Sequence, residues 1–441
     1  DADDDAVGGQ SGSGSSRDRT DKNGALAIPM DRRFPRVRLL TRRARELRGQ
    51  RLVVRVTRWS AYSRHPEARV IKALGPAGDL AAETAAILAE CNVAATNVFS
   101  PGAMNELPTV DSTGREGGFK DEWRVPDAEL ARRVDMRGVR TMSVDPPGCV
   151  DVDDAVSVRR IRLDTRADVD ADVDADAEVG YEVGVHIADV SHFVRPGSLL
   201  DLEARTRGTT VYLADGGRCD MLPALLSENV CSLLGGRERL AVSCVWTLDA
   251  DCRSVGAGAW FGRTVIRSDH QLNYYQAQAI LDGKPPPTKA DDLNDAAETR
   301  RVRADLAVLA AFARRRNAAR TARGAVELAS AELRFETSSD GVPRDVLTKG
   351  EVPMMRVIAE LMIAANAAVA EKIVWTQGVG RAFVRRHPPP RPEGFDELRG
   401  LMRRAGVSLD ASDGAALAKS LVSAISKATS DKVFDNVSAN K

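Results

Sequence analysis

Residues 141–155 read Thr-Met-Ser-Val-Asp-Pro-Pro-Gly-Cys-Val-Asp-Val-Asp-Asp-Ala and contain four aspartates: Asp145, Asp151, Asp153 and Asp154. Carboxylates this close together repel one another unless a positive charge lies among them. A hard divalent cation held by oxygen ligands is the simplest compensation. The stretch therefore predicts a metal site and, with it, magnesium-dependent chemistry on a charged substrate.

Two other interpretations of the aspartates compete with a catalytic metal site. An EF-hand calcium loop that began at Asp151 would need glycine at its sixth position and glutamate at its twelfth, where the chain has Val156 and Arg162. The other alternative is a solvated acidic loop. The valines between the aspartates argue against it, because they imply burial beside the charges, and buried carboxylates need a counter-ion.

The composition sets wide bounds. A chain of 441 residues is long enough for two or three domains. Basic and acidic residues number 63 each, so the net charge does not indicate a nucleic-acid partner, although arginines cluster at 31–38 and 41–45. Six cysteines without a C-x-x-C pair indicate reduced, mostly buried thiols of an intracellular protein. There is no long apolar run and no signal peptide, so no membrane partner is expected.

The N-terminal part divides into a polar tail and a small β-rich domain. Residues 1–33 are rich in Gly, Ser and Asp and are predicted to be disordered. Residues 34–105 contain short runs with strand periodicity and one helical stretch. The strand-like runs are 35–40, 51–59 and 68–74, and the helix is 83–90. Short strands that carry arginine and aromatic residues predict a β-barrel of the OB, or cold-shock, type, which often binds single strands.

The remainder predicts a linker and a larger mixed domain. Residues 106–138 are expected to form a linker anchored by Trp123, residues 139–425 the second domain, and residues 426–441 an unassigned tail. The domain's strands are expected at 141–144, 155–161, 181–188, 240–248 and 257–266, and its helices at 296–321 and 352–374. The repetitive acidic insert 164–178 is interpreted as a solvated hairpin extension rather than a cation site.

Histidines and tyrosines offer further candidates. His186 and His192 could join Asp189 as zinc ligands or as a base, but no nearby cysteine completes a zinc set, and a histidine satisfied by hydrogen bonds is the favoured interpretation. His387 follows Arg386 in an apparent loop, which suits a phosphate contact and a solvated arginine pair equally. The following residues fit either base stacking or core packing: Tyr212, Tyr274 and Tyr275.

Residues 141–155 and several other stretches of the chain together resemble the signature of the RNB, or ribonuclease II-like, exoribonuclease family. Beyond residues 141–155, the matching stretches are 183–198, 207–213, 221–223, 226–233, 361–370 and 384–388. Within the family, the Pro-Pro-Gly-Cys form of the aspartate stretch is similar to that of the catalytic subunit of the eukaryotic exosome. Residues 51–74 resemble that subunit's second cold-shock domain, and the resemblance as a whole covers roughly 34–425.

The resemblance implies an α+β fold, in which an OB/cold-shock β-barrel is followed by an incomplete RNB-type mixed α/β catalytic domain. It implies a hydrolytic 3'-to-5' exoribonuclease that degrades or processes single-stranded RNA to nucleoside 5'-monophosphates as part of the exosome. The implied partners are single-stranded RNA and the exosome core subunits. The implied location is the nucleus or nucleolus, with the cytoplasm as an alternative.

The resemblance also implies roles for individual residues. Two magnesium ions, with manganese as an alternative, are held about 4 Å apart at the scissile phosphate by Asp145, Asp151, Asp153 and Asp154. Asp153 matches the position most tied to catalysis. The residues implied to contact RNA are Tyr212, Tyr274, Glu360, Arg386 and His387. The two tyrosines match aromatics that stack on the terminal bases, and the glutamate matches a carboxylate near the final nucleotide.

The chain also departs from the family pattern. Family members carry two adjacent glutamates before the Met-x-x-x-Asn stretch, and the first is Ala359 here. The catalytic arginine of the family lies in a Thr-Ser-Pro-x-Arg-x-Tyr segment that this chain does not contain. A missing preorganised cation slows phosphoryl chemistry by orders of magnitude. We therefore expect a fragment whose full-length protein is an exoribonuclease and which is itself weak or inactive.

Two alternatives stay open at this point. The first is a non-catalytic RNA-binding protein on an incomplete RNB scaffold, against which the survival of all four aspartates weighs. The second is a product that does not fold.

Overall fold

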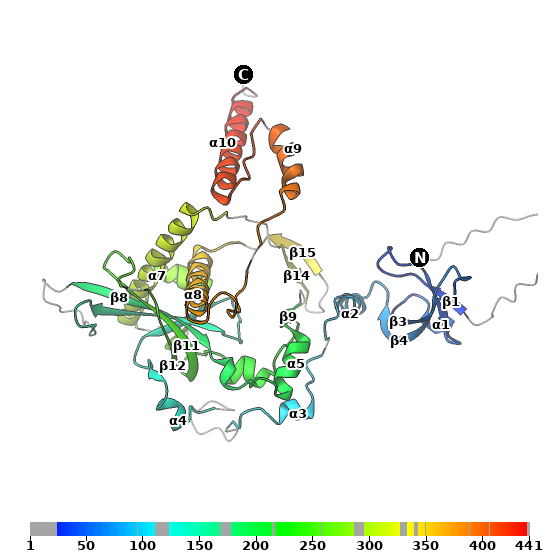
Figure 1. The fold of residues 1–441 in the computed structure, drawn as a ribbon, viewed down its shortest axis with the longest axis horizontal. Coiled ribbons are helices and arrows are strands. Elements are labelled where there is room, and N and C mark those ends of the chain that lie inside the picture. The colour runs from blue at the N-terminus through cyan, green and yellow to red at the C-terminus, as the bar shows by residue number, and fades with distance from the viewer. Residues whose placement is uncertain are drawn as a thin grey trace, which may run out of the picture. The chain divides into compact units, whose positions relative to one another are not determined.

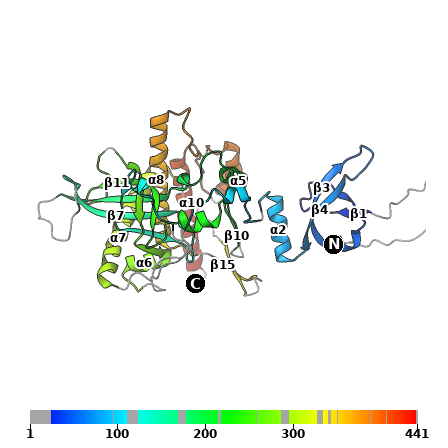
Figure 2. The ribbon, with the colours of Figure 1, turned by 90° about the horizontal axis from the view of Figure 1, so that it is seen from below.

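The computed structural model describes residues 24–94, 96–110, 123–166, 168, 178–213, 217–256, 258–285, 295–326, 333–338, 343–348, 350–386, 388–404 and 406–438. These residues form two compact units, which Figures 1 and 2 show. The first unit contains the chain up to residue 100 with 202–221 and 335–346, and the second contains the rest. Each unit is described by itself.

A small sheet and two helices form most of the first unit. The strand order is β1-β2-β4-β3, in which β2 runs parallel to β4 and the other neighbours are antiparallel. The elements are β1 (Gly24–Ala27), β2 (Val37–Leu40), α1 (Ala44–Leu47), β3 (Gln50–Arg58), β4 (Glu67–Pro76) and α2 (Leu80–Glu90). Val37, Leu39 and Ala68 form its core. The three strands and the helix predicted for this domain are confirmed.

The first strand corrects the prediction for the polar tail. Residues 1–33 are predicted to be disordered, but Gly24–Ala27 pair residue by residue with β2. A short apolar run at the end of the tail is enough to form an edge strand once β2 offers its hydrogen-bonding groups. The prediction is therefore wrong for residues 24–27, and residues 1–23 lie outside the described part.

A seven-stranded sheet forms the centre of the second unit, with the order β13-β6-β7-β8-β11-β12-β5. The five inner strands are antiparallel, whereas β13 runs parallel to β6 and β5 runs parallel to β12. The strands are β5 (Val134–Asp135), β6 (Thr141–Asp145), β7 (Asp154–Arg162), β8 (Val179–Ala188), β11 (Glu238–Leu248), β12 (Trp260–Arg267) and β13 (His270–Asn273). Their near-continuous apolar runs are typical of strands that are covered by other elements.

Three helices pack against this sheet (Figure 1): α6 (Tyr274–Asp282), α7 (Ala296–Ala322) and α8 (Pro353–Gln377). Leu306, Leu309 and Phe312 of α7 enter the same buried cluster as the strand valines, and the rings of Trp246 and Phe312 lie 5.5 Å apart. The three-and-four spacing of these apolar residues produces the buried stripe. The helices predicted at 296–321 and 352–374 are confirmed.

A second apolar cluster involves the stretch predicted as a linker. Trp123 is 8% exposed and packs edge-on against Phe193, with 5.1 Å between ring centroids, so its predicted role as an anchor is confirmed. Val125 joins the same cluster, and β5 joins the sheet. The described end of the stretch, from residue 123 onwards, is thus built into the second domain.

The remaining elements are short or lie near the C-terminus. They are α3 (Pro101–Met104), α4 (Asp127–Leu130), η1 (Val190–His192), α5 (Leu199–Arg207), β9 (Val211–Tyr212), β10 (Arg218–Cys219), η2 (Leu225–Val230), β14 (Leu333–Thr337), β15 (Pro343–Thr348), η3 (Pro392–Phe395), α9 (Asp396–Arg404) and α10 (Gly414–Ser438). Within the described residues, no helix combines the length and apolar character needed to cross a membrane.

Candidate active site

The four aspartates lie on one hairpin of the large sheet. Strand β6 ends at Asp145, and its antiparallel neighbour β7 begins at Asp154, with Met142 paired to Val156. Gly148 has a φ of +81°, in the left-handed region that glycine adopts without strain, and so it lets the chain turn after two prolines. The two ends of the aspartate stretch therefore lie next to each other, at the same end of the paired strands β6 and β7.

The carboxylates of the hairpin are partly withdrawn from water and feel one another's charge. Burial, followed by the charge of Asp154, raises the pKa of Asp145 to about 7. Burial and the charge of Asp153 raise the pKa of Asp154 to about 6. The pKa of Asp153 is also raised, by burial and then by Asp151. The hairpin thus holds several carboxylates in a place where their negative charge is unfavourable.

These carboxylates fit a divalent cation. The Oδ2 atom of Asp145 is buried and has no hydrogen-bond partner among the described residues. A buried carboxylate oxygen without a partner costs free energy, and hard oxygen donors are the ligands that magnesium and manganese prefer. Within the described residues, however, no three His, Cys, Asp or Glu side chains lie close enough together to hold a metal ion as they stand. Metal binding by the hairpin therefore stays a prediction.

The structure brings Tyr274 to the aspartates. Asn273, the last residue of β13, is paired with Asp145 of β6, and Tyr274 begins α6 directly after it. Asn273 caps this helix, since its side chain accepts hydrogen bonds from the backbone of Tyr275 and Gln276. Burial and then the charges of Asp145 and Asp154 raise the pKa of the Tyr274 hydroxyl. A half-buried aromatic ring thus stands beside the carboxylates.

Glu360 lies on α8 and faces α7 rather than open solvent. Its side chain is bonded to Arg320, and Nδ2 of Asn317 donates to its Oε1 at 2.9 Å. Burial alone would raise the pKa of Glu360, but the hydrogen bonds from Arg320 and Asn317 outweigh it, and the pKa is below its usual value. Glu360 is therefore an ionised, oriented carboxylate that is only 7% exposed.

The other predicted RNA contacts are distributed as follows. Tyr212 belongs to the first unit, where it pairs with Arg218 across β9 and β10, and it is 65% exposed. Arg386 is exposed in the segment after α8. His387 lies outside the described residues.

The alternative zinc or base site is not formed. His186 is fully buried, with its Nδ1 atom 2.7 Å from the Ser243 hydroxyl and its Nε2 atom 2.8 Å from the Ser157 hydroxyl. Burial lowers the pKa of His186 to about 4. The favoured interpretation, a histidine satisfied by hydrogen bonds, is confirmed.

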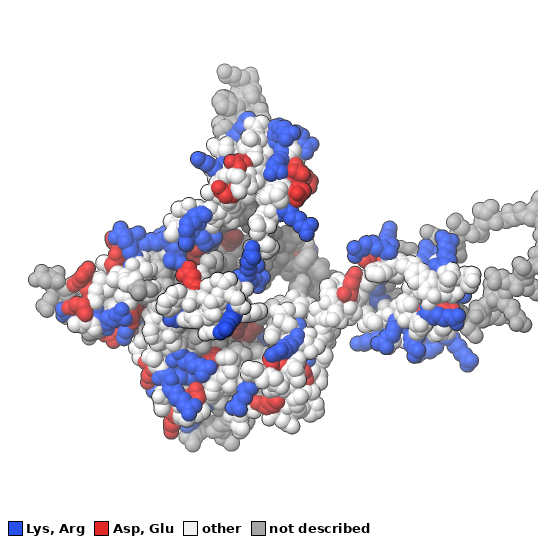
Figure 3. Space-filling view, in the orientation of Figure 1, with Lys and Arg blue, Asp and Glu red and all other residues white. Residues whose placement is uncertain are grey.

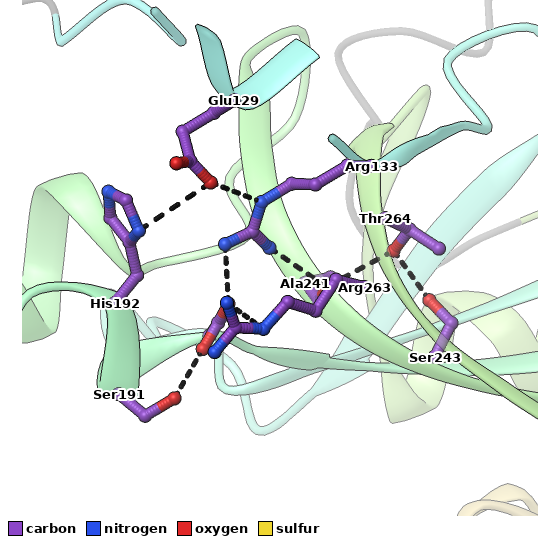
Figure 4. Close-up of polar contacts among 9 residues, drawn as sticks. Glu129, Arg133, Ser191, His192, Ala241, Ser243, Arg263 and Thr264 are labelled. Atoms are coloured by element: carbon purple, nitrogen blue, oxygen red, sulfur yellow. Dashed lines mark hydrogen bonds and ion pairs between the residues drawn. The ribbon is translucent and has the colours of Figure 1, made fainter. Parts of the chain in front are cut away.

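Asp189 and His192 belong instead to a polar cluster around Arg133, of which Figure 4 shows Arg133, Glu129 and His192. Arg133 donates to Asp189 Oδ2 at 2.7 Å and to Glu129 Oε2 at 2.9 Å, and the side chains of Arg133 and Asp189 are completely buried. His192 Nδ1 lies 3.7 Å from Glu129. Sequence reasoning missed Arg133 because it lies 56 residues from its partner, in a stretch expected to be a linker.

Matches to two family models agree with this architecture. The model of the RNB domain matches residues 133–440. The chain belongs to the RNB family. The model of the Dis3-like cold-shock domain 2 (CSD2) matches residues 24–92, so the RNB domain of this chain follows an OB-type cold-shock domain.

The relatives that this RNB protein matches are much longer than the chain itself. "Probable exosome complex exonuclease RRP44" of Caenorhabditis elegans is 36% identical over 409 residues, which cover 91% of this chain and 38% of that protein. Mycoplasma genitalium RNase R in complex with ribose methylated single-stranded RNA has a TM-score of 0.67 at 20% identity, covering 85% of this chain and 52% of the other. Yeast Ssd1, a pseudonuclease, has a TM-score of 0.61 at 21% identity, covering 88% and 44%. The two structures show the fold, which nuclease and pseudonuclease share.

Proposed function

We propose that this chain carries the metal-binding part of a hydrolytic 3'-to-5' exoribonuclease, which degrades or processes single-stranded RNA to nucleoside 5'-monophosphates. The observation that carries the proposal is the aspartate hairpin, in which burial and mutual repulsion raise the pKa values of Asp145, Asp153 and Asp154. The name of the relative, an exosome complex exonuclease, supports the same reaction.

The proposed roles of the residues come from the family resemblance, and the position of Tyr274 beside the aspartates supports one of them. Asp145, Asp151, Asp153 and Asp154 would hold two magnesium ions, with manganese as the alternative, and the ions would activate water and stabilise the leaving 3'-oxygen. Tyr274 presents its ring beside the aspartates, where it stacks on a base near the 3' end. Glu360, kept ionised by Arg320, accepts hydrogen bonds from the final nucleotide. Tyr212 is likewise proposed to stack on a terminal base, and Arg386 and His387 are proposed to contact RNA.

The first unit supplies a basic surface for the RNA backbone. Residues 31–76 contain fourteen lysines and arginines and only three acidic residues. Figure 3 shows the Lys and Arg side chains spread over this unit, and Trp59 and Tyr62 are exposed on it. A basic surface with aromatic rings suits a single strand, because phosphates and bases are both contacted. By analogy with the relative, the partners would be exosome core subunits in the nucleus or nucleolus, with the cytoplasm as an alternative.

The test is release of mononucleotides from a 5'-labelled single-stranded RNA. It is made on the 441-residue chain and, in parallel, on the protein with whatever sequence adjoins it in the transcript. We expect product that depends on added magnesium and that is abolished by Asp153→Asn. The matched control is Asp164→Asn, which removes an exposed aspartate that pairs with Arg162 outside the hairpin. Intact RNA in every form, with magnesium present, would contradict the enzyme.

The alternative is a non-catalytic RNA-binding protein on the same scaffold. The observation that favours it is that no ligand group converges among the described residues. It predicts RNA affinity that depends on salt but not on metal, and no mononucleotide product. The same assay, combined with RNA binding in the presence of a chelator, separates the two proposals.

A further inference from the structure

The backbone of the aspartate loop is held by a serine from a distant part of the chain. Ser232 Oγ accepts a hydrogen bond from the backbone N–H of Val152 at 2.9 Å and donates to the carbonyl of Val150 at 2.8 Å. These two groups stand on either side of Asp151. One hydroxyl therefore restrains the direction of the chain both before and after a proposed metal ligand.

Neighbouring contacts fix the rest of this segment. The N–H of Leu233 donates to the carbonyl of Val152 at 2.9 Å, and the N–H of Ala188 on β8 donates to the carbonyl of Asp153 at 3.0 Å. The side chain of Val152 is fully buried with Leu233. Asp151 is half-buried and Asp153 is exposed on either side of the buried Val152, so an anchored Val152 leaves both aspartate side chains outside the core.

Ser232 is itself held rigidly. It is 1% exposed, and its backbone carbonyl accepts a hydrogen bond from Nε of Arg239 at 3.0 Å. Arg239 is also 1% exposed and bonds the carbonyl of Asn229 at 3.1 Å. The guanidinium of a residue near the start of β11 thus fastens the turn after η2, and this turn carries the hydroxyl that holds the loop. The support thus joins the sheet to the aspartate loop through Ser232 and Val152, which are 80 residues apart in the chain.

We propose that Ser232 is a positioning residue for the metal-binding aspartates and that Arg239 acts through it. Four carboxylates repel one another, so a flexible loop would spread them apart whenever no cation is bound. A backbone restrained on both sides of Asp151 keeps the ligands near their binding arrangement, and the cation then does not have to order the loop. This inference rests on the proposed function, because it assumes that the hairpin binds metal.

The test measures manganese affinity directly, by the loss of the free Mn²⁺ electron paramagnetic resonance signal on titration of the 441-residue chain. We expect Ser232→Ala to weaken Mn²⁺ binding by about tenfold or more. Cysteine is close to serine in size but is a weaker hydrogen-bond donor and acceptor. The Mn²⁺ affinity of Ser232→Cys is therefore expected to lie between those of the wild-type chain and Ser232→Ala. The matched control is Ser243→Ala, since Ser243 is equally buried and hydrogen-bonded but supports His186 instead of the loop.

A second readout separates positioning from general stability. In Ser232→Ala, amide hydrogen exchange of the peptide around residues 146–155 should become faster, while strand β8 keeps its protection. If Ser232→Ala does not fold, the Mn²⁺ affinity of Ser232→Cys tests the inference instead. Mn²⁺ affinity that is unchanged in folded Ser232 variants overturns the inference and leaves the exoribonuclease proposal standing. A wild-type chain that binds no Mn²⁺ overturns the inference and the exoribonuclease proposal together. A loss of Mn²⁺ affinity in Ser243→Ala as large as that in Ser232→Ala overturns the positioning role alone.

Discussion

The imidazole of His186 lies between the hydroxyls of Ser157 and Ser243 in the middle of the large sheet. It has no access to water, so a positive charge on the ring would be buried without solvation. This is why burial lowers its pKa to about 4, against about 6.5 for an exposed histidine. A residue that looks like a ligand or a base in the sequence is here a neutral part of the core.

The depressed pKa of His186 predicts how stability depends on pH. Below pH 6.5 the unfolded chain takes up a proton that the folded chain refuses, so the stability is full above that value and falls as the pH drops towards 4. Between pH 7 and pH 5, this residue should remove about 2 kcal/mol from the free energy of unfolding. His186→Asn should lower stability at pH 7 but flatten the fall. Denaturation at both pH values checks this, and an equal fall in wild type and variant would contradict it.

Residues whose partners are close in the chain could be predicted from the sequence, and residues with distant partners could not. The aspartates share one hairpin, so ten residues of sequence show the cluster. The residues alone make Tyr274 one of three candidate tyrosines, and its place beside the aspartates could not be predicted from them, because β13 brings it to Asp145 by pairing with β6. Arg133 gives no local signal, and Ser232 lies in the matching stretch 226–233 without any sign of its partner. Their roles depend on strand order, which only the folded chain shows.

At the scale of elements, the buried pair of Arg133 and Asp189 joins the segment between α4 and β5 to the residue that follows β8. Both side chains are completely buried, and Arg133 also bonds Glu129 of α4 itself. A buried ion pair contributes little net stability against an apolar pair of the same size, but a single partner left behind is strongly destabilising. The pair therefore specifies where the stretch before β5 docks on the sheet.

This asymmetry predicts the result of a double-mutant cycle. Arg133→Met leaves Asp189 charged and buried, and should lower the free energy of unfolding by about 3 kcal/mol or more. Arg133→Met combined with Asp189→Leu should recover part of the loss, because the buried carboxylate of Asp189 is removed with its partner, while Glu129 still loses its bond to Arg133. Thermal or denaturant unfolding of the four forms measures the coupling. Additive effects of the two substitutions would show that the pair is not coupled.

The contact between α7 and α8 depends on a second ion pair, which joins Arg320 to Glu360. Arg320→Ala should leave the carboxylate of Glu360 with Asn317 as its remaining partner and raise its pKa towards or above the usual value. We expect a loss of about 1–2 kcal/mol in the free energy of unfolding, less than for Arg133, because the side chain of Arg320 is 33% exposed. The control is Arg323→Ala, at the exposed end of α7. Equal melting temperatures in the two variants would show that the ion pair of Arg320 and Glu360 does not stabilise the fold.

At the scale of the whole molecule, the two units differ in what their sequences reveal. The OB-type unit is recognised from strand periodicity and arginine content, both of which are local. The sheet of the RNB domain has its first strand in sequence, β5, at one edge and its last, β13, at the other. No periodicity indicates that order, and the parallel pairings of both edge strands are long-range. The family resemblance implied the type of domain but not the order of its strands.

The charge of the OB-type unit predicts how the chain as a whole binds single-stranded RNA. Arg55 and Arg58 of β3 are exposed beside Trp59, so they can reach phosphates while the ring meets a base. For single strands, the logarithm of the binding constant falls with the logarithm of salt by about 0.7 per phosphate contact. Arg55→Gln together with Arg58→Gln should therefore make the slope shallower by about 1.4, with chelator present. Arg399→Gln, which removes an arginine already paired with Asp396, is the control and should leave the slope unchanged. If the double variant keeps the wild-type slope, the basic face of β3 does not contact the RNA backbone, and the affinity must come from the RNB domain.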